Sequence, residues 1–206
     1  KGPQALEACR RRVVKLFTYS SEEQKPIKGS REEKVLEEIY SFYTGRKSRF
    51  ESLAAIITSR IIQKNGHTYY PGWITPASSD HGADFIGRLD IGTDLARAKV
   101  IVLGQAKCEK ISSPTGGNHI ARTVARLRRG WIGVYVTTSY FSVPVQREVL
   151  QDKYPILLVN GLRLTKEAIE LAHEQGFASI QEFLESIDIN HDARVKNRDP
   201  EEILFE

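Results

Sequence analysis

The chain has 206 residues, of which 40% are hydrophobic, and a formal net charge of +4. This length suffices for one ordinary core. No stretch approaches the roughly 18 consecutive apolar residues that a membrane-spanning helix needs, and the first residues do not resemble a secretory signal, so we expect no membrane partner. The two cysteines, Cys9 and Cys108, lie far apart and lack metal-ligand spacing, which favours a reducing cytoplasm.

The hydrophobic pattern predicts helices and strands along the chain. Ser30, followed three residues later by Glu33, is typical of a capping box, and it begins an amphipathic helix that extends to Tyr43. A second apolar stripe begins at Phe50 and ends before the Asn65-Gly66 stop signal. Strands are then expected at residues 67–74, 84–91, 99–107, 132–138 and 156–159, with helices at 119–129, 143–152, 165–175 and 179–187. This order predicts an α/β fold in which helices flank a mixed sheet.

Polar side chains stand at the ends of two predicted neighbouring strands. Asp84 leads into one strand, and Gln105-Ala106-Lys107 ends the next. Because alternate side chains of a strand share a face, Gln105 and Lys107 lie on one side, while Ala106 and Cys108 face the core. A carboxylate, an amide and an ammonium group are therefore expected to converge. Such a group can hold a divalent cation and activate a water molecule beside a phosphodiester.

Basic residues are concentrated in the middle of the chain. Residues 110–150 contain six basic side chains and one acidic side chain, a net charge of +5, whereas residues 164–206 carry a net charge of −7. On a helix at 119–129, Arg122, Arg126 and Arg129 would lie within an arc of roughly 60°. No acidic residue separates them. We expect this face to contact a nucleic-acid backbone, with a solvated surface helix as the alternative.

Two further groups of residues are candidates for phosphate contacts. Asn118 and His119 begin the same predicted helix, where free backbone N–H groups attract anions. Thr138 and Ser139 follow a predicted strand, and we expect their hydroxyl groups to bind phosphate rather than to act as nucleophiles.

Several motifs in a fixed order together resemble one known family. They are Phe50-Glu51-Ser52-Leu53-Ala54, the turn Asp80-x-Gly82-x-Asp84, Gln105-Ala106-Lys107, the run from Gly133 to Ser142, and residues 156–164. This ordered set resembles an Mrr-type restriction endonuclease domain of the PD-(D/E)XK nuclease superfamily, over somewhat more than half of the chain. The resemblance implies a restriction-endonuclease-like core that hydrolyses double-stranded DNA with Mg²⁺, or with Mn²⁺ as a substitute.

The resemblance also implies roles for the site residues. Asp84, Gln105 and Lys107 are the expected catalytic residues. The Asp84 carboxylate, the Gln105 amide oxygen and the Ala106 backbone carbonyl are the expected ligands of the metal ion. Lys107 is expected to orient the attacking water and to stabilise negative charge that develops on the phosphate.

Gln105 stands where the superfamily more often has an acid, which removes one negative charge from the metal site. Glu51 and Asp80 are therefore expected as accessory residues. For Glu51 the alternative is an exposed charge on a helix.

The resemblance divides the chain into three segments. We expect an N-terminal helical and linker segment at residues 1–45, the nuclease core at 46–164, and a C-terminal helical segment with a polar, acidic tail at 165–206. The chain contains no methionine, so we expect it to be a piece of a longer prokaryotic protein. In modification-dependent restriction enzymes, to which such domains are similar, an upstream domain reads methylated cytosine, and the basic run Arg10–Arg12 is where it could join.

One such site hydrolyses one strand, so cutting both strands favours a homo-oligomer of two or more copies. Two other functions stay open. One is a branched-DNA resolvase or nickase of the same fold, which its cleavage products would identify. The other is a non-catalytic DNA-binding domain, against which Asp84 and Lys107 argue.

Overall fold

The protein is built on one mixed five-stranded sheet with the strand order β1-β2-β3-β4-β5. The computed structural model describes residues 2, 4–9, 18–76 and 82–206. Strands β1, β2 and β3 pair in antiparallel fashion, whereas β3, β4 and β5 are parallel. The strands are β1 (Thr68–Ile74), β2 (Phe85–Ile91), β3 (Ala98–Lys107), β4 (Ile132–Thr137) and β5 (Ile156–Val159). The predicted α/β fold with a mixed sheet is confirmed.

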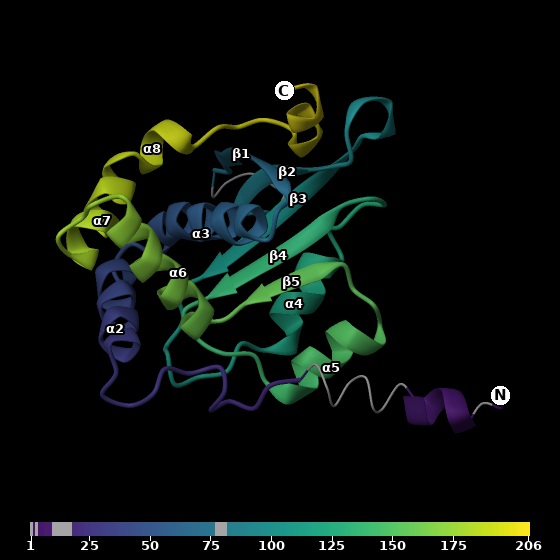
Figure 1. The fold of residues 1–206 in the computed structure, drawn as a ribbon, viewed down its shortest axis with the longest axis horizontal. Coiled ribbons are helices and arrows are strands. Elements are labelled where there is room, and N and C mark those ends of the chain that lie inside the picture. Colours follow the sequence, from purple (N-terminus) through teal and green to yellow (C-terminus); the bar gives the residue numbers. More distant parts are fainter. Residues whose placement is uncertain (1, 3, 10–17, 77–81) are drawn as a thin grey trace.

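Helices cover both faces of this sheet (Figure 1). Val134 and Val136 of β4 pack into a cluster with the helices of one layer, whereas Tyr135, which lies between them, packs with the other layer. Because neighbouring strand residues point to opposite faces, the two layers lie on opposite sides. The first layer contains α2 (Arg31–Tyr43), α3 (Phe50–Lys64), α6 (Gly161–Glu174) and α7 (Ile180–Ile189); the second contains α4 (Gly117–Val124) and α5 (Val143–Gln151).

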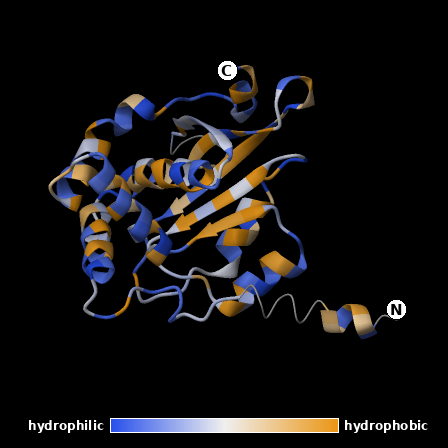
Figure 2. Ribbon diagram, in the orientation of Figure 1, coloured by the Kyte–Doolittle hydropathy of each residue, from blue (hydrophilic) through white to orange (hydrophobic). Residues whose placement is uncertain are grey.

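The central strands are predominantly hydrophobic, and polar residues gather on the outer sides of the helices (Figure 2). The largest core cluster contains residues from each of the three predicted segments, including Ile39 of α2, Val136 of β4 and Phe183 of α7. Helix α6 also continues across position 164, where the core segment was expected to end.

No helix in the described part of the chain is long and apolar enough to span a membrane.

Local helix signals are only partly confirmed. The Ser30 hydroxyl accepts the backbone N–H of Glu33, as predicted for an N-cap. The Glu33 carboxylate accepts the N–H of Gly29 rather than that of Ser30, so the predicted capping box is incomplete. Gly66, with a φ of 82°, follows α3 in the left-handed conformation that glycine tolerates.

Helix α4 is shorter than predicted, because it ends at Val124 rather than near residue 129. The backbone N–H groups of Arg126 and Leu127 bond three residues back, which tightens and ends the helix. Leu127 then packs against a separate cluster that contains Trp73 and Ile86. Burial of this apolar side chain is favourable, so tertiary packing outweighs the local helical preference.

The C-terminal residues form structure where a polar tail was expected. After α8 (His191–Arg194), the 3-10 helix η3 (Pro200–Phe205) packs on β2 and β3. Ile203 is buried in the cluster with Trp73. Arg88 of β2 is also buried, pairs with Asp90, and donates hydrogen bonds to the carbonyl groups of Ile203 and Glu206. These contacts bind the acidic end of the chain to the sheet.

Candidate active site

Asp84 is held by backbone hydrogen bonds where the chain enters β2. Its N–H donates to the carbonyl of Gly104 at 2.8 Å, and its carbonyl accepts from Thr75 at 3.1 Å. Its Oδ2 accepts the N–H of Ala106 at 2.7 Å. Because the N–H and C=O groups of a strand residue point to the same side, the Ala106 carbonyl is also directed towards Asp84. The carboxylate is thus fixed beside the strand end that carries Gln105 and Lys107.

Glu51 lies near these residues and comes from α3, in the first helical layer. It lies in the first turn of α3, and it lines a cavity of about 550 Å³ together with Asp84 and Lys107. The alternative of a fully exposed helix charge is therefore not observed. The cavity is also lined by Lys47, Ser48, Ala106, Cys108, Glu109, Lys110, Ser113 and His119. Cys108 is buried, as the strand alternation predicts.

The two carboxyl groups share a poorly solvated space. Burial and the nearby Asp84 raise the pKa of Glu51 to about 8, while Lys107 acts in the opposite direction. Burial also raises the pKa of Asp84, although hydrogen bonds from Ala106 and Gln105 and the charges of Lys107 and Arg126 oppose this shift. Two partly buried carboxylates that destabilise one another's ionised form favour a cation between them.

The donor atoms at this site fit Mg²⁺. The described residues contain no group of three or more His, Cys, Asp or Glu side chains arranged as a metal centre. Mg²⁺, however, usually needs only one or two carboxylates and completes its shell with water and phosphate oxygens. The Asp84 and Glu51 carboxylates, the Gln105 amide and the Ala106 carbonyl supply oxygen donors of the kind it prefers. Asp80, the other expected accessory residue, lies outside the described residues.

A second, smaller cavity of about 200 Å³ lies beside the first one. It is lined by Gln105, Lys107, His119, Arg122, Arg126 and Tyr135. Lys107 and His119 line both cavities. The structure thus brings three predicted DNA contacts, His119, Arg122 and Arg126, next to the predicted catalytic residues.

The predicted arginine face, by contrast, does not form on one helix. Arg122 lies on α4, but Arg126 and Arg129 come after its end at Val124. Arg126 instead donates to the Gly82 carbonyl at 2.7 Å. Asn118 is exposed in the first turn of α4, as the sequence indicates.

The predicted phosphate contacts of Thr138 and Ser139 are not supported by their positions, because both residues are buried. The Thr138 hydroxyl donates to the Glu109 carbonyl and accepts the Glu109 N–H. The Ser139 hydroxyl donates to the carbonyl of Ser113. These hydroxyl groups hold the segment that connects β3 to α4.

Glu109 also lines the larger of these two cavities, although no motif in the sequence singled it out. Its carboxylate accepts hydrogen bonds from Thr115 at 2.6 Å and from Thr137 at 3.0 Å, which ties the same connecting segment to β4. Glu109 follows Gln105 and Lys107 at the next alternate position. The period of two that identified those residues could therefore have extended to Glu109.

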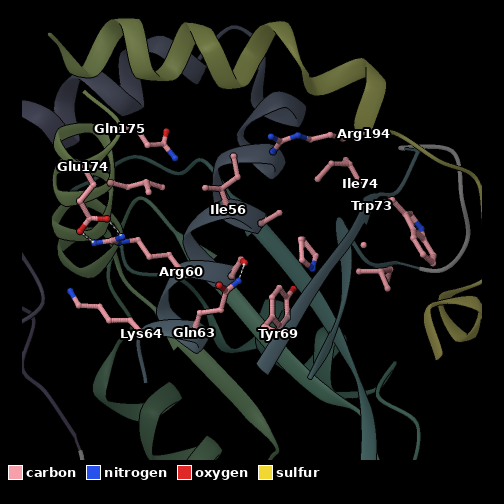
Figure 3. A pocket seen from close by; sticks show the side chains of 16 residues that line it. Ile56, Arg60, Gln63, Lys64, Tyr69, Trp73, Ile74, Glu174, Gln175 and Arg194 are labelled. Atoms are coloured by element: carbon pink, nitrogen blue, oxygen red, sulfur yellow. Dashed lines mark hydrogen bonds and ion pairs between the residues drawn. The ribbon is translucent and has the colours of Figure 1, made fainter. Parts of the chain in front are cut away.

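A larger cavity lies elsewhere, between α3, β1 and α6 (Figure 3). It has a volume of about 670 Å³ and contains none of the predicted site residues. Arg60, which lines it, extends towards Glu174 in Figure 3 and is paired with Glu174 at 2.6 Å and with Glu167 at 2.9 Å. Its charge is therefore largely neutralised within the protein.

Comparisons with known proteins point to one group of enzymes. A family model for restriction endonucleases, the Mrr catalytic type, matches residues 46–168. The MspJI restriction endonuclease, solved in complex with a 27-mer oligonucleotide, is 41% identical over 92% of this chain, with a TM-score of 0.88. The DNA modification-dependent restriction endonuclease AspBHI is 25% identical over 85% of this chain, with a TM-score of 0.71. This chain spans 42% and 44% of those two chains. No curated protein sequence matches it.

Proposed function

This chain belongs to the family of Mrr-type restriction endonucleases, and we propose that it hydrolyses double-stranded DNA with Mg²⁺ at the cavity shared by Glu51, Asp84 and Lys107. The family and the restriction-endonuclease fold predicted from the sequence are both confirmed. The observation that carries the proposal is the convergence of these side chains. They come from α3, from the entry to β2 and from the end of β3.

The residues of the chain divide the work between metal binding and phosphate binding. Asp84 and Glu51, with the Gln105 amide oxygen and the Ala106 carbonyl, hold the metal ion. When bound, Mg²⁺ polarises the phosphate and lowers the pKa of a coordinated water. Lys107 donates hydrogen bonds to the phosphate, orients the attacking water, and stabilises the charge that develops during the reaction. Mn²⁺ prefers similar oxygen ligands and substitutes for Mg²⁺.

Asp84 is suited to its role because its position is fixed before any metal binds. The Ala106 N–H holds the Oδ2 atom of the carboxylate. A ligand that is already oriented loses little conformational entropy on binding. Glu51 restores the negative charge that Gln105 does not supply.

The whole protein is proposed to be a modification-dependent restriction enzyme of a prokaryotic cytoplasm. The support is its similarity to MspJI and AspBHI and the fact that it spans less than half of either chain. In this proposal, residues 46–164 form the nuclease core, and a separate domain upstream of residues 1–45 reads methylated cytosine. Two or more copies assemble so that both DNA strands are cut.

Cleavage of plasmid DNA tests the central proposal. Methylated and unmethylated plasmids are incubated with the protein and Mg²⁺, with EDTA as one control and Lys107→Ala as another. We expect Mg²⁺-dependent nicking or linearisation that the variant loses by at least about 10²-fold, because Lys107 stabilises the transition state. Cleavage that persists in Lys107→Ala or in EDTA would contradict the mechanism.

A further inference from the structure

The first turn of α3, which carries Glu51, lacks the usual helix cap. Its N-cap residue, Arg49, makes no side-chain capping bond within the described part of the chain, and α3 follows directly on the 3-10 helix η1 (Lys47–Arg49). Serine, threonine, aspartate or asparagine normally occupies the N-cap and holds the first N–H groups of a helix. The position of this turn therefore depends on contacts with other elements.

Those contacts come from the junction between α7 and α8, residues 188–192. The Arg49 guanidinium donates to the backbone carbonyl of Asp188 and to the carboxylate of Asp192, both at 2.9 Å. Arg46 donates to the Asp188 carboxylate at 3.0 Å. Figure 1 shows α7 beside α2 and one end of α3, both of which it contacts. These bonds tie the segment that leads into α3 to residues far along the chain.

A buried bond extends this attachment into α3 itself. The Ser52 hydroxyl and Nδ1 of His191, the first residue of α8, are 2.8 Å apart, and both side chains are buried. Whichever of the two groups donates, the bond is shielded from water, where a hydrogen bond is electrostatically stronger. Ser52 directly follows Glu51, so this bond restrains the turn that carries the Glu51 carboxylate.

The two neighbouring residues of this turn face different partners. Successive side chains of an α-helix point about 100° apart. Ser52 faces α8, whereas Glu51 lines the cavity that it shares with Asp84 and Lys107. Because the backbone of a helical turn is rigid, a bond that fixes the orientation of Ser52 also fixes the direction in which Glu51 points.

The proposed metal site needs such a restraint. The nearby Asp84 disfavours the ionised form of Glu51. When both carboxyl groups are ionised and no cation is bound, their repulsion pushes the first turn of α3 away from the sheet. A ligand that must be brought back into place binds a metal ion less tightly. Residues that orient the ligands of a metal ion typically contribute about 10- to 100-fold to its affinity.

We propose that Ser52 and His191 are positioning residues of the metal site, which hold the first turn of α3 so that Glu51 reaches a metal ion beside Asp84. This inference rests on the proposed endonuclease function, because it needs a metal ion at that site. Neither Ser52 nor His191 lines the cavity of the site. Both act through Glu51, so their loss weakens metal binding and leaves the chemical step, in which Lys107 takes part, largely unchanged.

The Mg²⁺ concentration that gives half-maximal cleavage distinguishes positioning from general stability. Ser52→Ala and His191→Leu should each raise this concentration by about 5- to 10-fold, with a maximal rate within about twofold of wild type. His191→Asn should restore most of the wild-type value, because its amide nitrogen can take the place of Nδ1. Thr165→Val is the matched control, since its buried hydroxyl donates to the Gly161 carbonyl within α6. It should leave the Mg²⁺ requirement unchanged.

Binding of Mn²⁺ in the absence of DNA gives a readout that is independent of cleavage. Electron paramagnetic resonance measures the free Mn²⁺ concentration. Ser52→Ala and His191→Leu should each weaken Mn²⁺ binding by about 5- to 10-fold. The double variant should weaken it no further, because both substitutions remove the same bond. Additive losses in the double variant, or wild-type affinity in both single variants, would overturn the inference.

The outcomes for the positioning role and for the endonuclease activity can be told apart. Wild-type protein that cleaves DNA with Mg²⁺, together with variants that keep its Mg²⁺ requirement, would overturn the positioning role alone. A lower maximal rate with an unchanged Mg²⁺ requirement would also overturn it, because a loss of folded protein has that effect. If His191→Leu does not fold, Ser52→Ala carries the test, since it removes only a hydroxyl group. Failure of the wild-type protein to bind Mn²⁺ and to cleave DNA would overturn both proposals.

Discussion

The Asp84 carboxylate and the Ala106 backbone N–H are joined by a hydrogen bond of 2.7 Å. This bond links the beginning of β2 to the end of β3, so the proposed metal ligand and the proposed catalytic lysine belong to one rigid unit. Glu51 approaches the same unit from α3. The site therefore depends on both the sheet and the helical layer that covers it.

Replacing Glu51 by glutamine should impair cleavage and metal binding together. The change keeps the shape of the side chain but removes the charge that balances a divalent ion. We expect cleavage to fall by about 10²-fold, with partial recovery at higher Mg²⁺ concentration. Glu38→Gln on the exposed side of α2 is the matched control. Equal cleavage activity of the two variants would show that Glu51 does not contribute to the site.

The stability of the metal-free protein should decrease as pH rises. Burial raises the pKa of Glu51 to about 8, above its ordinary value of 4.5. Between these two values the folded state keeps a proton that the unfolded state has lost, so this contribution to stability is complete below pH 4.5 and is lost towards pH 8. Chemical denaturation in the presence of EDTA should show that the free energy of unfolding falls by roughly 1–2 kcal/mol over this pH range, allowing for partial solvent access. Glu51→Gln should remove this part of the pH dependence; an unchanged profile would contradict the assignment.

Mg²⁺ should counteract the loss of stability at higher pH. The ion binds the ionised carboxylates, and at pH 6 its binding must also release the proton of Glu51. The increase in melting temperature at a fixed Mg²⁺ concentration should therefore be larger at pH 8 than at pH 6. Glu51→Gln should show a smaller increase that depends less on pH. An increase that is larger at pH 6 would exclude this coupling.

The two cysteines should react at very different rates with a thiol reagent at pH 8. Cys9 is exposed, whereas Cys108 is buried, and burial raises the pKa of the Cys108 thiol to about 11. Little thiolate is present at pH 8, and the thiolate is the reactive form. We expect one fast and one slow phase, with Cys9→Ser removing the fast phase. Rapid modification of Cys108 in the folded Cys9→Ser variant would show that the cavity lined by Cys108 opens to the reagent.

Arg88 should contribute far more to stability than another arginine paired with an acid. Its pair with Asp90 is buried, and replacement by alanine leaves Asp90 with only the longer contact of 3.9 Å to Arg97. The expected loss is about 3 kcal/mol or more. Arg128→Ala disrupts an exposed pair with Glu201 and should cost less than about 1 kcal/mol. Urea denaturation measures both. Similar losses of unfolding free energy in the two variants would show that the packing of the C-terminal residues on the sheet does not depend on Arg88.

Features set by short-range rules were predictable from the sequence. The alternation of strand side chains placed Gln105 and Lys107 together and Cys108 in the core, because a period of two follows from backbone geometry alone. The Ser30 N-cap was predictable for a similar reason, since its hydroxyl bonds within one turn. The family was recognisable because its motifs occur in order along the chain.

Features that depend on distant partners were decided by the tertiary structure. Helix α4 ends early because Leu127 packs against the cluster that contains Trp73, and the C-terminal residues are ordered because Arg88 binds their carbonyl groups. The Thr138 hydroxyl is buried and donates a hydrogen bond to the Glu109 carbonyl, a partner that its position in the sequence does not reveal. The sequence by itself determined which chemical groups each strand end presents. Only the folded chain decided which of them meet and which remain unpaired, because burial and hydrogen bonding join residues that no local pattern connects.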